Sequence, residues 1–420
     1  GAPVGWPRSP RLGTRRSCAG EARRFAGAER QGAEPGPLAL PLEAPTGPSV
    51  FLEPDLQGPQ TLQPLTGCPD SLAAGATLPI NRLQLDESMD ELASSVKPWC
   101  AGSFGFVKKL QAAPRNQGWV DKMQVNDDSR RHVAVKRMKL SWVRTGPKPF
   151  EEVHPHQTER PWCDIGLVRE LNKKNFPYVC SLLGLFCDGS SMYVVSSLAD
   201  QGDLYVWSLS LPQQGIEREA MVQPVAAQVC KAVGWLHELG IAHRDVSLEN
   251  LLLTRTGPEC LRVQVIDFGM ATLSRRCRGN RYGKPSYQAP EMHGGQAYDA
   301  FLADAFSVGV VVYALAARQY PWQSTRLDVD KHFARANHVG IGRYLQVVPL
   351  LLLDGQRRQA AEVFSEQLSE LLQGLLRPEP GGRLSLGESA FAGEEPPRPC
   401  VWDAPWLEGS QAGRPGAACL

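Results

Sequence analysis

The sequence predicts an α+β protein of two lobes, a small antiparallel-sheet lobe with one helix followed by a larger, mainly helical lobe. Short runs rich in β-branched and aromatic residues predict strands in the first part, at 105–110, 132–140 and 191–198. Apolar residues at helical spacing predict helices in the second part, at 222–239, 303–317 and 365–376. This change along one chain favours two packed lobes with the functional site in the cleft between them.

Both ends of the chain differ in composition from this folded part. Of the first 50 residues 16 are Gly or Pro, and seven of the first 30 are Arg, with no apolar periodicity. Such a composition is typical of disorder, because it buries too little apolar surface to fold. We therefore expect a disordered region at 1–92, a folded domain at 93–390 and a low-complexity tail at 391–420. The smaller lobe is expected at about 93–198 and the larger at about 199–390.

The overall composition argues against several classes of protein. Lys and Arg number 45 against 44 Asp and Glu, a formal net charge of +1, so no nucleic-acid partner is expected. Eleven scattered cysteines without a CxxC pair are typical of a reducing compartment, which predicts a cytoplasmic or nuclear location. The longest apolar run, 306–317, is too short to cross a bilayer, so neither a membrane segment nor membrane binding is expected. The first residues lack the apolar stretch of a signal peptide. No pattern indicates the oligomeric state.

Four short motifs place reactive groups at strand ends and in loops. VAVK at 133–136 ends a predicted strand with an ammonium group, and DFG at 267–269 places a carboxylate directly after an apolar run. HRDVSLEN at 243–250 places a carboxylate and an amide five residues apart in one loop, and APE follows at 289–291. A single motif of this kind is a weak signal. Four of them in this order are highly specific.

Together these motifs resemble the signature set of the eukaryotic protein kinases, over roughly residues 95–389. The resemblance implies the two-lobed kinase fold and transfer of the γ-phosphate of ATP, with Mg²⁺, to hydroxyl groups of protein substrates. By the resemblance, Lys136 would grip the α- and β-phosphates, and Asp245 would accept the proton of the substrate hydroxyl. Asp267 would hold a Mg²⁺ that bridges the phosphates, and Asn250 would hold a second Mg²⁺.

A further segment resembles the family's phosphate-covering loop. CAGSFGFV at 100–107 matches the pattern GxGxxGxV with cysteine in place of the first glycine. In this interpretation Gly102, Ser103 and Gly105 bring the backbone close to the phosphates. The remaining nucleotide contacts that the resemblance implies are Val107, Ala134 and Leu252 around the adenine, with Ser197 and Ala199 in the hinge beside it.

The acidic partner of Lys136 is the weakest part of the match. The family's ExxxLxxL pattern aligns with residues 164–171, so that Asp164 stands where a glutamate is expected, one methylene shorter. Glu159 and Glu170 are alternative partners. Asp164 as a solvated helix cap remains open as well.

A second departure concerns a cation near the γ-phosphate. Serine-directed kinases carry lysine two places after the catalytic aspartate, where this chain has Ser247, and Lys284 replaces the threonine expected before the APE motif. We hypothesise that Lys284 supplies the missing cation. The alternative is an exposed lysine in a variable loop.

Other residues resemble structural or regulatory members of the family. By the resemblance, His243 and Phe268 pack so as to align the lobes, and Gly269 gives flexibility next to the metal-binding aspartate. Arg244 would contact a phosphate on the activation segment, the stretch between the DFG and APE motifs. Asp304 would hold the catalytic loop at 243–250, and Arg383 would form an ion pair with Glu291.

These observations favour a protein serine/threonine kinase, and YQAPE at 287–291 supports the choice of hydroxyl. The main alternative is a pseudokinase, a nucleotide-binding scaffold without efficient transfer, which Cys100, Asp164 and Ser247 would suit. A small-molecule phosphotransferase shares the spacing of the aspartate and asparagine but would lack the APE element and Arg383.

Overall fold

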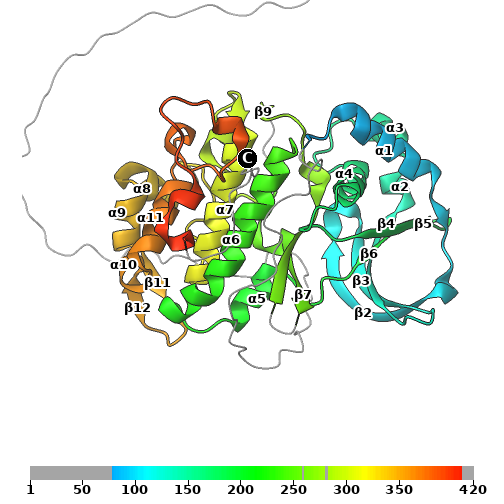
Figure 1. Ribbon diagram of the computed structural model, residues 1–420, viewed down its shortest axis with the longest axis horizontal. Helices are drawn as coiled ribbons and strands as arrows, with labels where there is room; N and C mark the ends of the chain where they lie inside the picture. The colour runs from blue at the N-terminus through cyan, green and yellow to red at the C-terminus, as the bar shows by residue number, and fades with distance from the viewer. Residues whose placement is uncertain (1–77, 258–259, 280–281, 409–420) are drawn as a thin grey trace, which may run out of the picture. The chain divides into compact units, whose positions relative to one another are not determined.

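The computed structural model describes residues 78–257, 260–279 and 282–408 (Figure 1). The smaller lobe contains one six-stranded sheet in the order β1-β5-β6-β4-β3-β2. Its strands are β1 (Lys97–Pro98), β2 (Phe104–Ala113), β3 (Gly118–Val125), β4 (His132–Lys139), β5 (Leu182–Cys187) and β6 (Ser191–Ser197). All neighbours pair antiparallel except the two-residue edge strand β1, which runs parallel to β5. The sheet is therefore mixed, whereas the sequence predicted an antiparallel one.

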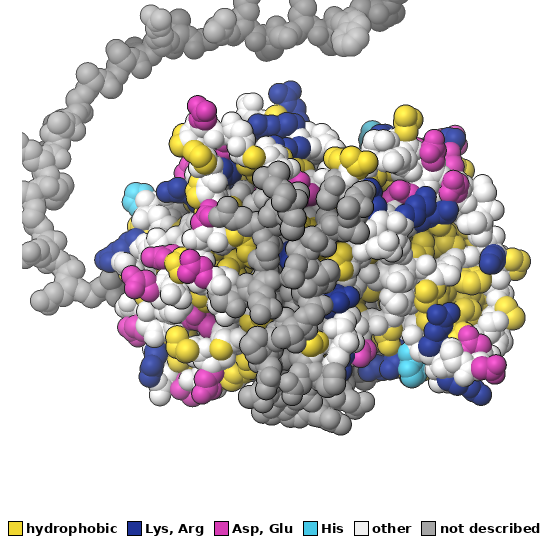
Figure 2. Space-filling view, in the orientation of Figure 1, with side chains coloured by type: hydrophobic (Ala, Val, Ile, Leu, Met, Phe, Trp, Pro, Cys, Tyr) yellow, Lys and Arg dark blue, Asp and Glu magenta, His cyan; other side chains and the backbone are white. Residues whose placement is uncertain are grey.

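The strands of the smaller lobe have one apolar face that is separate from the main core. Val133 and Val135 of β4 alternate with Ala134 and Lys136, so they point away from the side that carries the lysine. They form a small cluster with strand neighbours such as Tyr193. Figure 2 shows hydrophobic side chains gathered over these strands.

Among the described residues the smaller lobe has four helices where the sequence predicted one: α1 (Arg82–Ser94), α2 (Leu140–Val143), α3 (Pro147–Val153) and α4 (Pro161–Lys173). Helix α4 begins at a proline, which suits the first position of a helix because the backbone N–H there has no helical partner. Its residues Ile165, Leu167 and Leu171 are buried in the main core. Because α4 begins at Pro161, Asp164 falls in its first turn, where it contacts Phe268 of the larger lobe.

Helix α1 starts within the segment predicted to be disordered and runs across its end, so the boundary at 92/93 is wrong. Asn81 and Gln84 form a reciprocal capping box at its start. Leu85, Met89 and Leu92 share one helical face and are buried in the main core. Gly166 of α4 lets them approach closely, because a Cβ there would lie 2.7 Å from Met89. The prediction for residues 1–77 lies outside the described residues.

The larger lobe is mainly helical, as predicted. Its helices are α5 (Leu204–Ser210), α6 (Ile216–Glu238), α7 (Ala300–Ala317), α8 (Lys331–Val339), α9 (Ile341–Val347), α10 (Ala360–Val363) and α11 (Glu366–Leu375). Three two-stranded sheets complete it: β7 (Leu251–Gly257) with β8 (Cys260–Val265), β9 (Arg276–Cys277) with β10 (Tyr298–Asp299), and β11 (Pro349–Leu351) with β12 (Arg357–Gln359). The helices predicted at 222–239, 303–317 and 365–376 correspond to α6, α7 and α11.

Helix α7 forms the centre of the larger lobe. Among the described helices it is the one that is long and apolar enough to cross a membrane, and all 18 of its residues are buried inside the protein. Asp299 caps its first turn by accepting hydrogen bonds from Phe301 N and Leu302 N. This burial is what the core helix of a folded lobe requires.

The last described segment is folded, although 391–420 was predicted to be a low-complexity tail. Val401, Trp406 and Leu407 lie in short 3-10 turns and are buried in the main core. Trp406 Nε1 donates to Glu219 Oε2 of α6 at 3.3 Å. Three apolar anchors in a Pro- and Gly-rich segment form no periodic pattern, which is why the sequence did not indicate them. The prediction for 409–420 lies outside the described residues.

Candidate active site

Lys136 of β4 pairs with Asp164 of α4, their Nζ and Oδ2 atoms lying 3.0 Å apart. The other carboxylate oxygen, Oδ1, accepts a hydrogen bond from the backbone N–H of Phe268 at 2.9 Å. Asp164 therefore links the lysine to the DFG segment. Burial disfavours the charged lysine, but Asp164 and Asp267 outweigh it and raise the pKa of Lys136 above its ordinary value.

The two alternative partners of this lysine have other contacts. Glu170 pairs with Lys173 at 2.7 Å. Glu159 is buried, and its Oε1 accepts from Asn116 Nδ2 at 3.2 Å. Burial, together with the charge of Asp267, raises the pKa of Glu159 to about 8. Glu159 also packs against Gly269, where a Cβ would meet its Oε1 at 2.5 Å, so any larger residue at 269 would displace the Glu159 side chain.

The catalytic loop brings Asp245 and Asn250 together as the spacing predicted. Asn250 Nδ2 donates to the backbone oxygen of Asp245 at 2.8 Å and to its Oδ2 at 3.1 Å. Lys284 enters the same loop, with its Nζ 2.6 Å from Ser247 Oγ and 3.9 Å from Asp245 Oδ1. Its side chain is 24% exposed, which argues against the alternative of a free surface lysine. Glu249 Oε2 lies 3.4 Å from the same ammonium group.

Asp267 is a half-buried residue in an unusual backbone conformation, and its Oδ1 atom is buried. Its φ is 65°, in the left-handed region that residues other than glycine seldom adopt. Burial would raise the pKa of Asp267, but Lys136 and His243 outweigh it and lower that pKa below its usual value. Among the described residues, Asp267 Oδ1 has no hydrogen-bond partner.

An unpaired buried carboxylate oxygen and a nearby amide fit a divalent cation such as Mg²⁺. Asp267 and the side-chain carbonyl of Asn250 would hold it. Within the described ranges, no three acidic, histidine or cysteine side chains converge tightly enough to bind an ion alone. Mg²⁺ is usually bound by one or two carboxylates plus substrate phosphates, so this donor set is compatible with it.

Asp304 of α7 anchors the backbone of the catalytic loop. It accepts backbone hydrogen bonds from His243 at 2.6 Å and from Arg244 at 2.8 Å. His243 Nε2 lies 3.0 Å from the backbone oxygen of Ile266, and its ring packs against Phe268 with centroids 5.1 Å apart. These contacts align the loop with the DFG segment.

The Arg244 side chain is engaged by neutral groups. Its Nε donates to Met270 O at 2.7 Å and its Nη2 to Ala271 O at 3.3 Å. Its guanidinium carbon lies 3.6 Å from the ring centroid of Tyr282. The predicted contact to an activation-segment phosphate stays a prediction.

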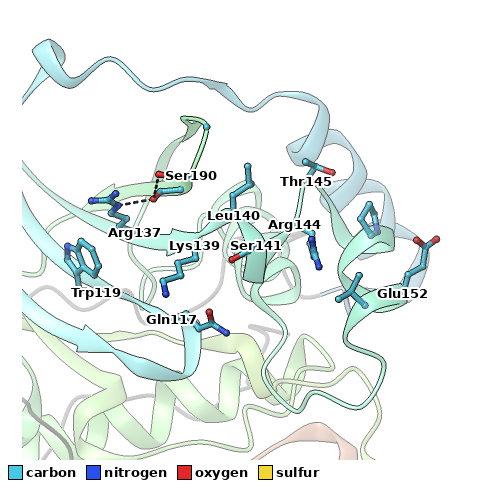
Figure 3. Close-up of a pocket in the computed structure, with 14 residues that line it drawn as sticks. Gln117, Trp119, Arg137, Lys139, Leu140, Ser141, Arg144, Thr145, Glu152 and Ser190 are labelled. Carbon is cyan, nitrogen blue, oxygen red and sulfur yellow. Dashed lines mark hydrogen bonds between the residues drawn. The ribbon is translucent and has the colours of Figure 1, made fainter.

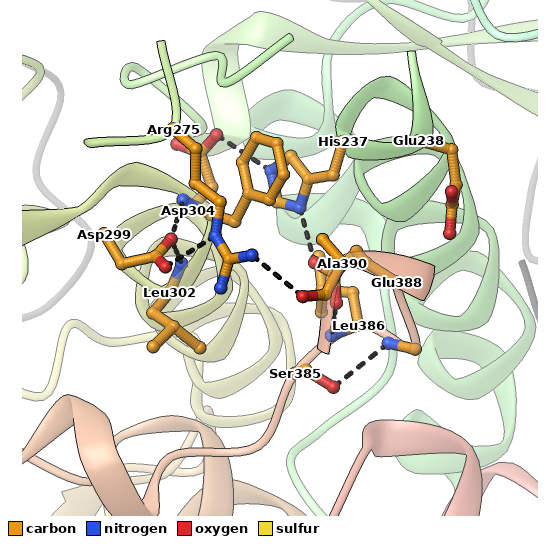
Figure 4. Close-up of polar contacts among 12 residues, drawn as sticks. His237, Glu238, Arg275, Asp299, Leu302, Asp304, Ser385, Leu386, Glu388 and Ala390 are labelled. Carbon is orange, nitrogen blue, oxygen red and sulfur yellow. Dashed lines mark hydrogen bonds and ion pairs between the residues drawn. The ribbon is translucent and has the colours of Figure 1, made fainter. Parts of the chain in front are cut away.

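One further ion pair and one ion triad fix the larger lobe around the site. Arg383 is fully buried and holds Glu291 with two parallel hydrogen bonds of 2.6 and 2.9 Å. The triad was not predicted from the sequence: His237 lies between Asp304 and Glu388, at 3.2 and 2.5 Å (Figure 4). Burial lowers the pKa of His237, but the two carboxylates outweigh it and raise the pKa to about 9.

The prediction of a phosphate-covering loop at 100–107 is wrong. Gly102 and Ser103 lie in a 3-10 turn, and Gly105 pairs with Gln124 near the start of β2. Val107 is 44% exposed. These residues lie at the opposite end of the β2–β3 hairpin from the turn that reaches the catalytic loop.

That turn, at 114–117, contacts both lobes. Arg115 Nη1 lies 3.0 Å from Asp245 Oδ2, and the bond from Asn116 to Glu159 anchors the turn on the other side. Gly118 and Val120 follow it and match the last glycine and the valine of GxGxxGxV. A Cβ at Gly118 would lie 1.7 Å from a backbone oxygen of β4, so this glycine is required.

The signal for this turn was present in the strand order. Val120 pairs directly with Lys136. The turn at 114–117 leads into this strand, and from residue 113 the sequence fits GxGxxGxV with Ala113 and Arg115 in place of the first two glycines.

The expected adenine contacts other than Val107 lie on β4, on the hinge that follows β6, and on β7. Ala134 pairs with Ser196, next to Ser197. Ala199 follows two residues later, and Leu252 of β7 bridges to the segment after the hinge. All four expected residues other than Val107 are half-buried.

A cavity of about 790 Å³ lies elsewhere, on the flank of the smaller lobe (Figure 3). Figure 3 shows Trp119 and Arg137 from the sheet on one side of it and Arg144 and Glu152 from the α2–α3 region on the other. None of the catalytic candidates lines it.

Residues 116–391, more than half of the chain, match the protein kinase domain family. The chain belongs to the protein kinase family. Its fold, with the sheet lobe followed by the helical lobe, is the kinase fold.

Individual kinases are similar over shorter stretches. The chain is 29% identical over 208 residues to CBL-interacting serine/threonine-protein kinase 26 of Arabidopsis thaliana, covering 48% of this chain and 43% of that kinase. It is 27% identical over 244 residues to CBL-interacting protein kinase 22 of Oryza sativa subsp. japonica, covering 56% and 46%. It is 29% identical over 173 residues to serine/threonine-protein kinase kin-29 of Caenorhabditis elegans, covering 41% and 20%. The chain thus spans less than half the length of these relatives.

Proposed function

We propose that this kinase-family protein transfers the γ-phosphate of ATP to serine or threonine hydroxyl groups of protein substrates. The observation that carries the proposal is the double contact of Asp164, which binds Lys136 and the backbone of Phe268 at once. Phosphoryl transfer depends mainly on positioning and charge. One carboxylate that fixes both the phosphate-binding lysine and the DFG segment meets this need.

Each charged residue then has a defined task. Lys136 binds the α- and β-phosphates, and Asp245 orients the substrate hydroxyl and accepts its proton. The hydroxyl oxygen bonds to the γ-phosphorus while the bond from that phosphorus to the bridging oxygen breaks, and ADP departs with the bridging oxygen. Asp267 and Asn250 would hold Mg²⁺, which supplies neutralisation of the phosphate charge. Lys284, whose ammonium group contacts Ser247 of the catalytic loop, supplies a further cation near the γ-phosphate.

A pseudokinase remains the second candidate, and one observation favours it. The turn at 114–117 has lost two of the three glycines of the family pattern, and Arg115 forms an ion pair with the carboxylate of Asp245. The retained Lys136, Asn250 and Asp267 favour the enzyme, because a scaffold has no need of the complete set.

The test is transfer of labelled phosphate from Mg·ATP to a library of peptides with serine, threonine or tyrosine acceptors. We expect labelled serine or threonine with the wild-type protein and its loss in Asp245→Asn and Asp267→Asn. Asp128→Asn, an exposed aspartate in the β3–β4 turn, is the matched control and should behave as wild type. Labelled tyrosine alone would contradict the proposed hydroxyl class, and absence of transfer with intact ATP binding would favour the pseudokinase.

A further inference from the structure

Arg115 reaches from the tip of the β2–β3 turn into the catalytic loop of the other lobe. Its side chain is 42% exposed, whereas that of its partner Asp245 is 2% exposed. Burial lowers the pKa of Arg115, but Asp245, Glu159 and Asp267 outweigh it and raise the pKa above its ordinary value. A permanently charged guanidinium thus lies among the carboxylates at the proposed transfer site.

The turn also differs chemically from a glycine-rich loop. Such a loop binds phosphate through backbone N–H groups that glycine leaves accessible. Here Pro114 has no backbone N–H to donate, and Arg115 stands where the pattern has its second glycine. A guanidinium offers a rigid fork of donors that matches phosphate oxygens. The side chain of Arg115 is therefore suited to replace the lost backbone donors.

The turn is held in place independently of Arg115. Asn116 donates to the buried Glu159, and Gly118 lets β3 pair closely with β4. Arg115 itself is partly exposed, and within the described part of the chain it forms an ion pair with one carboxylate oxygen, Asp245 Oδ2. Its side chain is thus free to change partner while the backbone of the turn stays fixed.

We propose that Arg115 is a binding residue for the terminal phosphate of ATP, an inference that rests on the proposed function. In the ligand-free protein the guanidinium pairs with Asp245, and with ATP bound it pairs with the γ-phosphate instead. Arg115 thereby exchanges one anionic partner for another. The buried Asp245 keeps its hydrogen bond from Asn250 Nδ2 and the Lys284 ammonium 3.9 Å away. The Asp245 oxygen that had been paired with Arg115 is then free to accept the hydroxyl proton.

The competing interpretation is that Arg115 only blocks Asp245. The two interpretations predict opposite effects of removing the guanidinium. A phosphate-binding arginine is needed for transfer, so its loss slows the reaction. A blocking arginine slows the reaction while present, so its loss speeds it.

The experiment compares wild type, Arg115→Ala and Arg115→Lys, with the exposed Arg131→Ala of the β3–β4 turn as matched control. The dissociation constants of adenosine, Mg·ADP and the Mg²⁺ complex of the β,γ-imido analogue of ATP are measured by calorimetry. Loss of one charge-assisted phosphate contact should weaken binding of the triphosphate analogue about tenfold to a hundredfold. Binding of adenosine and Mg·ADP should change by less than about twofold. Arg115→Lys should fall between, because it keeps the charge but not the fork.

Peptide phosphorylation provides the second readout, and kcat/KM for ATP should fall with the affinity for the triphosphate analogue. Unchanged adenosine binding shows that the variant is folded. Equal loss of diphosphate and triphosphate affinity, faster transfer by Arg115→Ala, or an equal loss in Arg131→Ala would each overturn the inference. A wild-type protein that binds no nucleotide would instead refute the proposed function itself.

Discussion

Replacing Asp164 by asparagine tests how the short carboxylate serves in place of the glutamate that the family pattern expects. The variant keeps the size of the side chain and leaves an oxygen to accept from Phe268 N, but it removes the charge that faces Lys136 at 3.0 Å. The pair is only partly exposed, 19% for the lysine and 12% for the aspartate, so solvent screens it weakly. A hydrogen bond between charged groups contributes about 1.5–3 kcal/mol.

This energy corresponds to a fall in kcat/KM for ATP of about tenfold to 150-fold, since every 1.36 kcal/mol is a factor of about ten. The assay is the initial rate of peptide phosphorylation as ATP is varied, with thermal unfolding measured alongside. Glu170→Gln, which removes the ion pair with Lys173 on the same helix, is the control and should leave the rate within about twofold. If Asp164→Asn kept the wild-type rate while Glu159→Gln lost it, Glu159 would be the functional partner and the reasoning would fail.

Three further substitutions probe the frame around the site. The raised pKa of His237, about 9, means that its charge stabilises the fold below about pH 6.5 and that this contribution, of order 3 kcal/mol, is lost as pH rises through 9. Urea unfolding of wild type should therefore weaken from pH 6.5 to 9 more steeply than that of His237→Gln, and parallel curves would contradict the assignment. Gly118→Ala should lower both the melting temperature and transfer, because its Cβ would meet Arg137 O at 1.7 Å, whereas Gly102→Ala, with open space around it, should do neither. Gly166→Val should push Met89 and helix α1 away, so that limited proteolysis cuts within 82–94; resistance equal to wild type would refute that packing.

The residues that could be predicted from the sequence are those whose geometry is set locally. Asp245 and Asn250 lie five apart in one loop, and their hydrogen bond follows from that loop alone. Asp267 comes two residues after the end of strand β8, so its place at the strand end is also local. Arg383 and Glu291 are far apart in sequence, and only the resemblance to a family could pair them.

The parts that were missed depend on contacts between distant segments. The phosphate-covering turn is defined by pairing of β3 with the lysine strand, and two glycines at 102 and 105 gave a more obvious but false match. His237 and Glu388 are 151 residues apart, and nothing in either local pattern indicates their contact. Helix α1 was missed because its three core-facing residues stand among acidic and polar ones in a short segment.

The most direct test of the central claim is single-turnover phosphate transfer by the full chain, measured for wild type and for Asp245→Asn. Calorimetry first establishes that each protein binds Mg·ATP. We predict that both proteins bind the nucleotide and that the wild type transfers phosphate to peptide hydroxyls at least about a hundredfold faster than the variant. Equal rates, or no transfer by a wild-type protein that binds Mg·ATP, would contradict the claim that these residues form a working phosphotransfer site.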